Sequence, residues 1–513
     1  MEAFTAVAVW AMTSACRSVP VTRDWANGLC PRGDADLQEL GAKLSSTAKV
    51  YFPGSSEFND ASARWSTLAE PNVTVVVVPG TESDVAETVK FANKKDLPFL
   101  AYNGAHGALT TLGQMTHGIE ISLSQLSSVE VAEDGKTAKF GGGTISKTVT
   151  DELWKVDKQA GKSIVSYIQS MTGTCECVSL LGPALGGGHG WLQGHHGLAS
   201  DQFLSMNVVL ANGTLITIDE KSDLWWAMKG AGHNFGIVTS LTTKIFDIEH
   251  RDWAIETITF SGDKVEAVYQ AANDYLLKNG TQPEGVINWS YWMNNATADP
   301  NNPVIVFYII QEGVKTVDSK YTNPFHDIGP LSVVHDSGTY KDLATWTGIA
   351  DSSIPCQKAG YSNPRFPIYL ESYDPQAQKK IWDIFAPAIR GNSVFNNSMF
   401  QFEGYSTQGV HNTNSRSSAY AFRNEHLLVA PLINYLPGGP DRDRQARALG
   451  TQLRDILHEA SGRKDMRAYV NYAYGDETPE QLYGSEQWRQ NRLRSLKQKY
   501  DPEGKFSFYA PIP

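Results

Sequence analysis

A glycine-rich stretch at residues 173–190 constrains this chain more than any other feature of its sequence. It holds six glycines and ends in the run Gly186-Gly-Gly-His-Gly190. Glycines at this density let the backbone pass close to a ligand and turn N–H groups toward it, which suits a pyrophosphate or the edge of a large planar ring. Between them lie Val178, Leu181 and Leu185, which are core residues rather than linker residues. The stretch therefore predicts a ligand-facing loop of a folded domain.

Cysteines and histidines gather around the same stretch, at Cys175, Cys177, His189, His195 and His196. Cys-X-Cys is not the usual zinc spacing, and no matching Cys/His pair follows at the usual offset, so we predict no metal site. The glycines lack the Gly-X-Gly-X-X-Gly spacing, and no Gly-Lys-Ser/Thr follows, which argues against the common dinucleotide and nucleoside-triphosphate loops. The three histidines are more typical of core or loop positions than of catalysis.

An earlier segment predicts a βαβ unit. Val73–Val78 is a continuous β-branched run, typical of a buried strand. Asp84 and Glu87 mark an acidic helix start, and a second strand is expected at 99–102. Because the strands of such a unit share one sheet, with the connecting loops at its carboxyl edge, we expect the loop Asn103-Gly-Ala-His-Gly107 to face a ligand.

The rest of the chain falls into two regions. From about 103 to 248 it is rich in glycine and short strands, and Asn212-Gly213 indicates a tight hairpin. From about 250 to 460, longer amphipathic stretches and β runs predict a second α+β domain. A basic helix is expected near the end of the chain. The expected strands are 118–123, 138–140, 206–210, 215–218, 253–260, 304–311 and 427–435, and the helix is 488–499.

Composition excludes several classes of partner. The chain has 513 residues, with 44 Lys plus Arg against 55 Asp plus Glu and a net charge of -11, so it has no basic surplus for nucleic acid or anionic lipid. No window reaches the roughly 18 to 20 uninterrupted apolar residues of a membrane span. We therefore expect no nucleic acid partner and no membrane span.

The N-terminus and the cysteines bear on localisation. Residues 4–12 are apolar and precede Thr13-Ser14-Ala15, but no Lys or Arg comes before them, so a signal peptide here would be atypical. We expect secretion, with a cytoplasmic location as the alternative. Six Asn-X-Ser/Thr sequons agree with a glycoprotein: Asn72, Asn212, Asn279, Asn288, Asn295 and Asn396. Five cysteines are too few for a disulfide framework; Cys16 and Cys30 are one candidate pair, and Cys356 stands alone.

Two more segments complete a recognisable order. Asp223-Leu-Trp-Trp-Ala-Met-Lys-Gly-Ala-Gly-His-Asn-Phe-Gly-Ile-Val238 combines a helix, a glycine turn and a strand, and Tyr469-Val-Asn-Tyr472 lies near the C-terminus. Together with the histidine loop and the glycine-rich stretch, they resemble the berberine bridge enzyme-like branch of the vanillyl-alcohol-oxidase flavoprotein family, over roughly 65–250 and 465–510.

The resemblance implies an α+β fold and its domains. A PCMH-type FAD-binding domain of two α/β subdomains is expected at 67–248, after an N-terminal segment at 1–66. A substrate domain with an antiparallel sheet covered by helices is expected at 249–464. A berberine bridge enzyme-like segment at 465–513 would pack back on the FAD domain. In the FAD domain, Trp225 and Trp226 are expected in the core, Asn234 would order a turn, and Asp201 would cap a loop.

The resemblance also implies how FAD is held. His106 would bond to the 8α methyl of the flavin and Cys175 would form a thioether to its ring, with Cys177 as a rival because Glu176-Cys177 departs from the family pattern. Such bonds fix the position of the flavin ring and raise its reduction potential. Val178 would lie where dioxygen adds and leave room for it, which favours an oxidase. The further expected cofactor contacts are Asn103, Gly104, Ala105, Gly107, Gly173, Thr174, Val178, Gly182, Gly186, Gly187, Gly188, His189, Gly190, Gly232, Gly236, Ile237, Tyr469 and Asn471.

Tyr472 matches the family position whose phenolate takes the substrate proton. A phenol has a pKa near 10, so a base role requires a neighbouring cation or donor, and plain packing against the ring is the competing interpretation. If the segment is a strand, Tyr469 and Asn471 alternate with Tyr472, and Asn471 faces away from the tyrosines. Asn434 is a substrate-side catalytic candidate and Glu403 a lesser one.

The expected activity is hydride transfer from a C–H bond to covalent FAD, with dioxygen reduced to hydrogen peroxide. The expected substrate is a small secondary-metabolite alcohol or phenol-like compound, with ring closure as an optional outcome. The alternatives are a carbohydrate oxidase, a flavin-scaffold isomerase or cyclase without net redox, and a carrier that has lost catalysis. We expect a monomer or a weak homo-oligomer.

Overall fold

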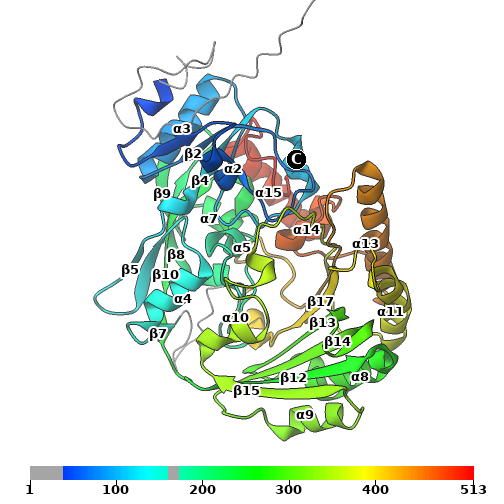
Figure 1. The fold of residues 1–513 in the computed structure, drawn as a ribbon. Helices are drawn as coiled ribbons and strands as arrows, with labels where there is room; N and C mark the ends of the chain where they lie inside the picture. Colours follow the sequence, from blue (N-terminus) through cyan, green and yellow to red (C-terminus); the bar gives the residue numbers. More distant parts are fainter. Residues whose placement is uncertain (1–38, 160–172) are drawn as a thin grey trace, which may run out of the picture.

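The computed structural model describes residues 39–159 and 173–513 (Figure 1). The apolar segment at 4–12 and the candidate pair Cys16 and Cys30 lie outside these residues. Within the described part of the chain, no helix has both the length and the apolar character needed to cross a membrane.

The first sheet contains the βαβ unit predicted from the sequence. Strands β2 (Val73–Val78) and β3 (Phe99–Tyr102) both pair in parallel with β4 (Gly118–Ser122), which lies between them. Helix α3 (Glu82–Lys94) connects β2 to β3, and Thr81 and Asp84 close its N-terminus with reciprocal hydrogen bonds. Both predicted strands and the helix are confirmed.

The expected start of the FAD-binding domain at residue 67 lies too late in the chain. Strand β1 (Lys49–Tyr51) pairs antiparallel with β2, so the first sheet has the order β1-β2-β4-β3. Leu40 is buried in the same core as Val77 and Val89. Residues of the expected N-terminal segment therefore form an edge of this domain. Helix α2 (Ser56–Ser62) lies between β1 and β2 in the chain.

A second, antiparallel sheet completes the cofactor half of the molecule. Its order is β5-β6-β10-β8-β9, and the predicted hairpin at Asn212-Gly213 joins its last two strands. Strands β7 and β11 pair with each other in a separate two-stranded antiparallel sheet. The strands are β5 (Val129–Val131), β6 (Thr137–Gly141), β7 (Lys158–Gln159), β8 (Phe203–Val209), β9 (Leu215–Asp219), β10 (Ile237–Lys244) and β11 (Phe246–Asp247), and the helices are α4 (Ser146–Trp154), α5 (Leu181–Leu185), α6 (Gln193–His196) and α7 (Leu224–Met228).

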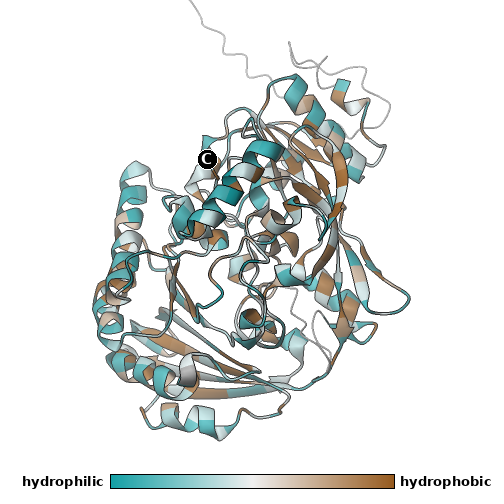
Figure 2. Cartoon of the chain, turned by 180° about the vertical axis from the view of Figure 1, so that it is seen from behind, coloured by the Kyte–Doolittle hydropathy of each residue, from teal (hydrophilic) through white to brown (hydrophobic). Residues whose placement is uncertain are grey.

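The substrate half is a seven-stranded antiparallel sheet with the order β15-β12-β14-β13-β17-β18-β16. Figure 2 shows apolar residues along its strands and hydrophilic ones on the outer sides of its helices. The strands are β12 (Trp253–Ser261), β13 (Val286–Asn295), β14 (Asp299–Glu312), β15 (Ser332–Gly338), β16 (Ile368–Leu370), β17 (Met399–Gly404) and β18 (Leu427–Leu432). The helices are α8 (Val265–Ala271), α9 (Ser319–His326), α10 (Leu343–Trp346), α11 (Pro375–Ile389), α12 (Gln408–His411) and α13 (Pro440–Ala460).

The two faces of this sheet have different partners, because successive side chains of a strand point to opposite faces. Trp292 and Phe307 pack against the helices, in one core with Phe385 of α11. Trp289 faces the other way and stacks on Trp191 of the cofactor half, with ring centroids 4.5 Å apart. The second face of the sheet therefore meets the cofactor half.

The C-terminal segment returns to the cofactor half (Figure 1). Helices α14 (Pro479–Tyr483) and α15 (Gln487–Tyr500) lie there, and Leu493 packs in one core with Trp225 and Trp226, as expected for that pair. The buried Asn234 side chain donates to the Ala510 carbonyl and accepts from the Ile512 N–H. Asn234 therefore anchors the end of the chain as well as lying in its turn.

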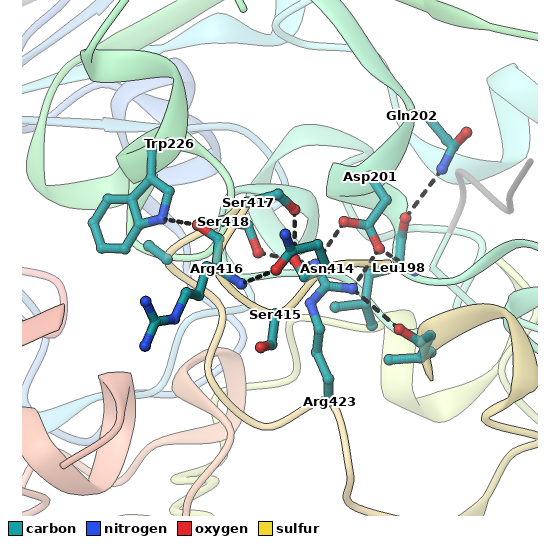
Figure 3. Close-up of polar contacts among 12 residues, drawn as sticks. Leu198, Asp201, Gln202, Trp226, Asn414, Ser415, Arg416, Ser417, Ser418 and Arg423 are labelled. Carbon is teal, nitrogen blue, oxygen red and sulfur yellow. Dashed lines mark hydrogen bonds and ion pairs between the residues drawn. The ribbon is translucent and has the colours of Figure 1, made fainter. Parts of the chain in front are cut away.

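A buried ion pair joins the two halves (Figure 3). Both Arg423 side-chain nitrogens donate to Asp201, at 2.6 and 2.8 Å, and both side chains are buried. Asp201 also accepts from the Leu198 N–H at 3.2 Å, which is the loop cap predicted for it. Nearby, the Trp226 indole donates to the Arg416 carbonyl at 3.0 Å. Asp201 is thus a junction residue in addition to a cap.

Candidate active site

A cavity of about 1150 Å³ lies between the two halves. One wall comes from the cofactor half: the loop after β3, the loop 173–182, the start of β10 and the C-terminal residues 505–509. The other wall comes from β13, β14 and β17 and from the segment 347–365. The volume exceeds that of a typical drug-sized pocket, so a large cofactor and a small substrate fit together.

His106 lies in this cavity, in the loop at the carboxyl end of β3. Its ring stacks on Trp65, with centroids 5.6 Å apart and 22° between the planes. Burial lowers the pKa of His106 to about 3, helped by the positive charge of Arg365. The imidazole is therefore neutral at physiological pH and keeps a free nitrogen lone pair.

Cys175 also lines the cavity and is the free thiol among the described cysteines. Cys177 and Cys356 form a disulfide, so the expectation that Cys356 stands alone is wrong. The same bond removes Cys177 as a rival for the flavin, because a sulfur in a disulfide is no longer a thiol. Burial raises the pKa of the Cys175 thiol to about 11.

Most of the expected cofactor contacts lie on the cavity wall. Beside His106 and Cys175, the lining includes Asn103, Gly104, Ala105, Gly107, Gly173, Thr174, Val178, Gly182, His189, Gly236, Ile237, Tyr469 and Asn471.

Five expected glycines do not line the cavity: Gly186, Gly187, Gly188, Gly190 and Gly232. Close packing explains why most of these positions hold glycine. A side chain at Gly187, which has φ of +107°, would meet the Tyr420 ring at 2.5 Å, and one at Gly232 would meet Leu185 at 2.7 Å. Their small size lets the segments behind the cavity approach one another.

The C-terminal tyrosines do not lie on a strand. Residues Val470–Tyr472 form one turn of 3₁₀ helix, so the predicted alternation is wrong. Asn471 lines the cavity with Tyr469 and Tyr472 instead of facing away, and its amide donates to the Pro183 carbonyl at 2.9 Å. A helical turn places neighbouring residues about 120° apart rather than on opposite faces.

Tyr472 shares a buried hydrogen-bond cluster with Glu403 of β17. The Tyr472 hydroxyl donates to one carboxylate oxygen at 2.8 Å, and the Tyr405 hydroxyl donates to the other at 2.6 Å. The Gln401 amide also donates to Glu403. Burial raises the pKa of Glu403. The carboxylate is thus held by three donors at the cavity wall.

Arg365 places a cation beside Tyr472, and sequence reasoning missed this residue. Its guanidinium lies over the Tyr472 ring, 4.3 Å from the centroid, and 4.8 Å from that of Trp65. Burial and the charge of Glu403 raise the pKa of Tyr472 well above its usual value, and the Arg365 charge opposes them. The phenol therefore keeps its proton while no substrate is bound.

Asn434 lines the cavity, but it follows the strand instead of lying on it, because β18 ends at Leu432. Its amide donates to Asn363, and its own carbonyl oxygen is buried without a partner. The Asn103 amide nitrogen and the Asn471 carbonyl oxygen, also on this wall, are likewise buried and unpaired. Unpaired buried polar atoms at a cavity indicate that a polar ligand belongs there.

His189 lies among tyrosines and lines the cavity. Its ring nitrogens contact Gln193 at 2.7 Å and the Tyr369 hydroxyl at 2.8 Å, and burial lowers its pKa to about 4. His195 lies away from the cavity and contacts Glu284 and Glu312. Both are structural histidines, as the sequence indicated.

The substrate-side wall combines aromatic and apolar residues with polar ones such as Asn294, Gln357 and Ser398. Beside Trp65, its members include Trp289, Tyr291, Met293, Tyr308, Ile349, Met399, Tyr405 and Leu432. Sequence reasoning assigned none of these to the site. The alternation Phe400-Gln-Phe-Glu403 contains the relevant signal, because its polar members face the cavity and its aromatic members face the helix-covered core.

These residues fit FAD. A neutral imidazole and a free thiol lie on one cavity wall, beside loops of small residues and unpaired amide groups that suit the polar edge of the ring. The FAD binding domain family matches residues 73–219, and the berberine and berberine-like family matches residues 468–513.

Two named relatives match the sequence of this chain over its full length. FAD-linked oxidoreductase chyH of Penicillium rubens is 62% identical over 513 residues, with 100% of this chain and 99% of the relative covered. FAD-linked oxidoreductase chry5 of Gibberella zeae is 53% identical over 524 aligned positions, with 100% and 99% covered.

The chain belongs to the berberine bridge enzyme-like family of FAD-linked oxidoreductases. The solved structure of Physcomitrella patens BBE-like 1 shares the fold, with a TM-score of 0.76 at 20% identity, covering 93% of this chain and 99% of that one. The protein is therefore an FAD-dependent oxidoreductase that acts on a small molecule, and its fold is the expected α+β fold.

Proposed function

We propose that this protein is an oxidase that removes a hydride from a C–H bond of a small organic substrate and passes the electrons to dioxygen, giving hydrogen peroxide. The observation that carries the proposal is the Tyr472–Glu403 hydrogen bond of 2.8 Å in the cavity that also holds His106 and Cys175. An acid–base pair beside the cofactor residues is what oxidation of an alcohol or phenol requires.

FAD, when bound, supplies the hydride acceptor and the route of electrons to dioxygen. His106 would hold the flavin ring covalently, and Cys175 would provide a second link. Val178 lines the same wall and would leave space for dioxygen beside the ring. These assignments follow the resemblance, residue by residue.

Tyr472 and Glu403 act as a proton relay. As the substrate C–H bond loses its hydride, the substrate hydroxyl proton moves to the Tyr472 oxygen, and the Tyr472 proton moves to Glu403. A phenolate formed alone would lie beside a carboxylate in a buried site, which is costly. Protonation of Glu403 in the same step avoids two adjacent negative charges, so Glu403 is the final base and Tyr472 is the group that contacts the substrate.

The substrate class follows from the wall that faces this relay. Trp289, Tyr291 and Met293 line it with aromatic rings and a thioether rather than charge, and aromatic side chains pack favourably against flat rings. We therefore favour an aromatic or phenol-like secondary metabolite over a carbohydrate.

The test is anaerobic mixing of the purified holoenzyme with a panel of aromatic alcohols, phenols and oligosaccharides, followed by flavin absorbance. Loss of the oxidised flavin band, with oxygen uptake and hydrogen peroxide on aeration, is the expected result. Tyr472→Phe should slow flavin reduction by about 10²- to 10⁴-fold, the usual contribution of a positioned acid–base group.

Tyr373→Phe is the matched control, because this hydroxyl is buried in the substrate half away from the cavity and makes no hydrogen bond. It should reduce its flavin at the normal rate. Full activity of Tyr472→Phe would refute the relay, and turnover without oxygen uptake would identify an isomerase or cyclase instead.

A further inference from the structure

Three sulfur atoms lie close together beside the cavity, which Cys175 lines. Cys177 and Cys356, which are 179 residues apart, form a disulfide, and the Cys175 sulfur lies 3.6 Å from the Cys177 sulfur and 3.7 Å from the Cys356 sulfur. Cys175 thus has two possible partners at nearly equal distance, and both are already bonded to each other.

Contacts other than the disulfide hold the loop of Cys175 and the segment of Cys356 together. The Glu176 N–H donates to the Ile349 carbonyl at 3.2 Å, and the Asp351 N–H donates to a Glu176 carboxylate oxygen at 2.8 Å. Lys147 adds an ion pair to Glu176 at 3.7 Å. The junction between the loop of Cys175 and the segment of Cys356 therefore has support that does not depend on the disulfide.

The position of the disulfide has a chemical consequence. Attack of the Cys175 thiolate on the Cys356 sulfur would form a Cys175–Cys356 bond and release Cys177 as a thiolate, and attack on Cys177 would release Cys356. Neither exchange needs an oxidant, because one disulfide and one thiol are present before and after it. Either product would leave Cys175 without the thiol that a bond to the flavin ring requires.

We propose that the Cys177–Cys356 disulfide selects the sulfur that is attached to the flavin: it ties up both neighbouring thiols and reserves Cys175 for the cofactor. The inference rests on the covalent FAD attachment of the proposed function. Thioether formation joins the Cys175 sulfur to the ring, with loss of the thiol proton and one ring hydrogen, and the two electrons released pass to dioxygen.

The electrostatics of the site agree with this assignment. Burial raises the pKa of Cys175 to about 11, so little thiolate is available at neutral pH to attack the disulfide. At neutral pH this protonation slows exchange of Cys175 with the disulfide.

The first experiment maps the native holoenzyme. The protein is denatured at mildly acidic pH with the alkylating agent N-ethylmaleimide and without reductant, digested, and analysed by mass spectrometry for flavin peptides and disulfide peptides. The expected result is a Cys177–Cys356 peptide pair together with flavin on the Cys175 peptide. Cys175 found in a disulfide, or carrying the alkyl group in most molecules, would overturn the proposal.

Variants separate chemical selection from simple positioning. Cys356→Ser frees Cys177 and should lower the fraction of flavin on Cys175 about tenfold, because dioxygen can then oxidise the Cys175 and Cys177 thiols to a disulfide, taking up their two electrons and two protons as hydrogen peroxide. Cys177→Ser/Cys356→Ser removes both competing sulfurs and should restore the Cys175 link. A double variant as low as the single one would overturn selection. Flavin attached to Cys177 in Cys356→Ser would support it, because the freed sulfur then competes with Cys175 for the ring.

The outcome is distinguishable from failure of the proposed function. A native enzyme that reduces its flavin with substrate but lacks the Cys175 link would overturn this inference and leave the oxidase intact. A native enzyme with the Cys175 link that no panel substrate reduces would support the inference and count against the oxidase.

Discussion

The two walls of the cavity are built in different ways. The cofactor wall comes mainly from short contiguous loops, such as 103–107 and 173–182, that present small residues, main chain and two reactive side chains. The substrate wall comes from three strands and one long segment, and its charged members are Glu403 and Arg365. One wall is organised to hold a cofactor, and the other is organised to carry the acid–base chemistry.

Glu403→Gln is the strongest test of whether the substrate wall carries the acid–base chemistry. Glutamine can still accept the Tyr472 hydrogen bond but cannot take its proton, so flavin reduction should slow by about 10²- to 10⁴-fold while FAD content is unchanged. Stopped-flow absorbance under anaerobic conditions measures the rate, and the acid-precipitated pellet measures covalent flavin.

Glu371→Gln is the control for that substitution. Its carboxylate belongs to the same half, pairs with Arg463 at 2.6 Å and is mostly exposed outside the cavity. It should leave the rate unchanged. If Glu403→Gln reduced its flavin at the native rate, the substrate wall would not carry the base.

The junction of the two halves gives the next largest effect. Arg423→Met leaves Asp201 as a buried charge without its partner, which should lower the free energy of unfolding by about 3–5 kcal/mol. Chemical denaturation of the holoenzyme measures the change. Arg423→Met/Asp201→Leu removes both charges and should recover most of the loss; a double variant as unstable as the single one would show that the pair acts through packing.

The difference between the walls also explains what the sequence could predict. His106 follows the predicted β3 directly, and Cys175 lies in a contiguous glycine-rich loop, so local motifs were enough to locate both. The fold class followed from the family resemblance, and the β-branched run, the acidic helix start and the hairpin turn were predictable because their structures depend on near neighbours.

Residues of the substrate wall depend on contacts between distant segments. Glu403 reaches the cavity because β17 pairs with β13 and β18, an arrangement no local pattern specifies. Arg365 is placed by an isolated bridge to Leu432, and Cys356 meets a partner 179 residues away. The 3₁₀ turn at Tyr472 was missed because three residues carry too little periodicity to distinguish a turn from a strand.

Arg365→Met tests whether the positive charge on the substrate wall lowers the pKa values of Glu403 and Tyr472. The Arg365 cation opposes the burial that raises the pKa values of Glu403 and Tyr472, so its loss should raise both further. Because Glu403 must be ionised to act, the rise of activity with pH should move upward by about one pH unit. Arg365→Lys keeps the charge and should restore the native profile; an unchanged profile in Arg365→Met would remove the cation from the acid–base chemistry.

The smallest expected effect lies at the junction again, where His195 of α6 contacts Glu284 and Glu312 of the substrate half at 2.8 and 2.6 Å. Burial alone would lower the pKa of His195, but the hydrogen bonds and charges of the two carboxylates outweigh it and raise the pKa. A raised folded-state pKa means that this stabilisation is fully present below the unfolded value of about 6.5 and is lost as pH rises through the folded value. His195→Gln should therefore cost about 1 kcal/mol at pH 5.5 and progressively less at higher pH. Denaturation midpoints of both proteins across pH 5.5 to 9 measure the difference, and a gap that stays constant with pH would show that His195 joins the halves as a neutral side chain.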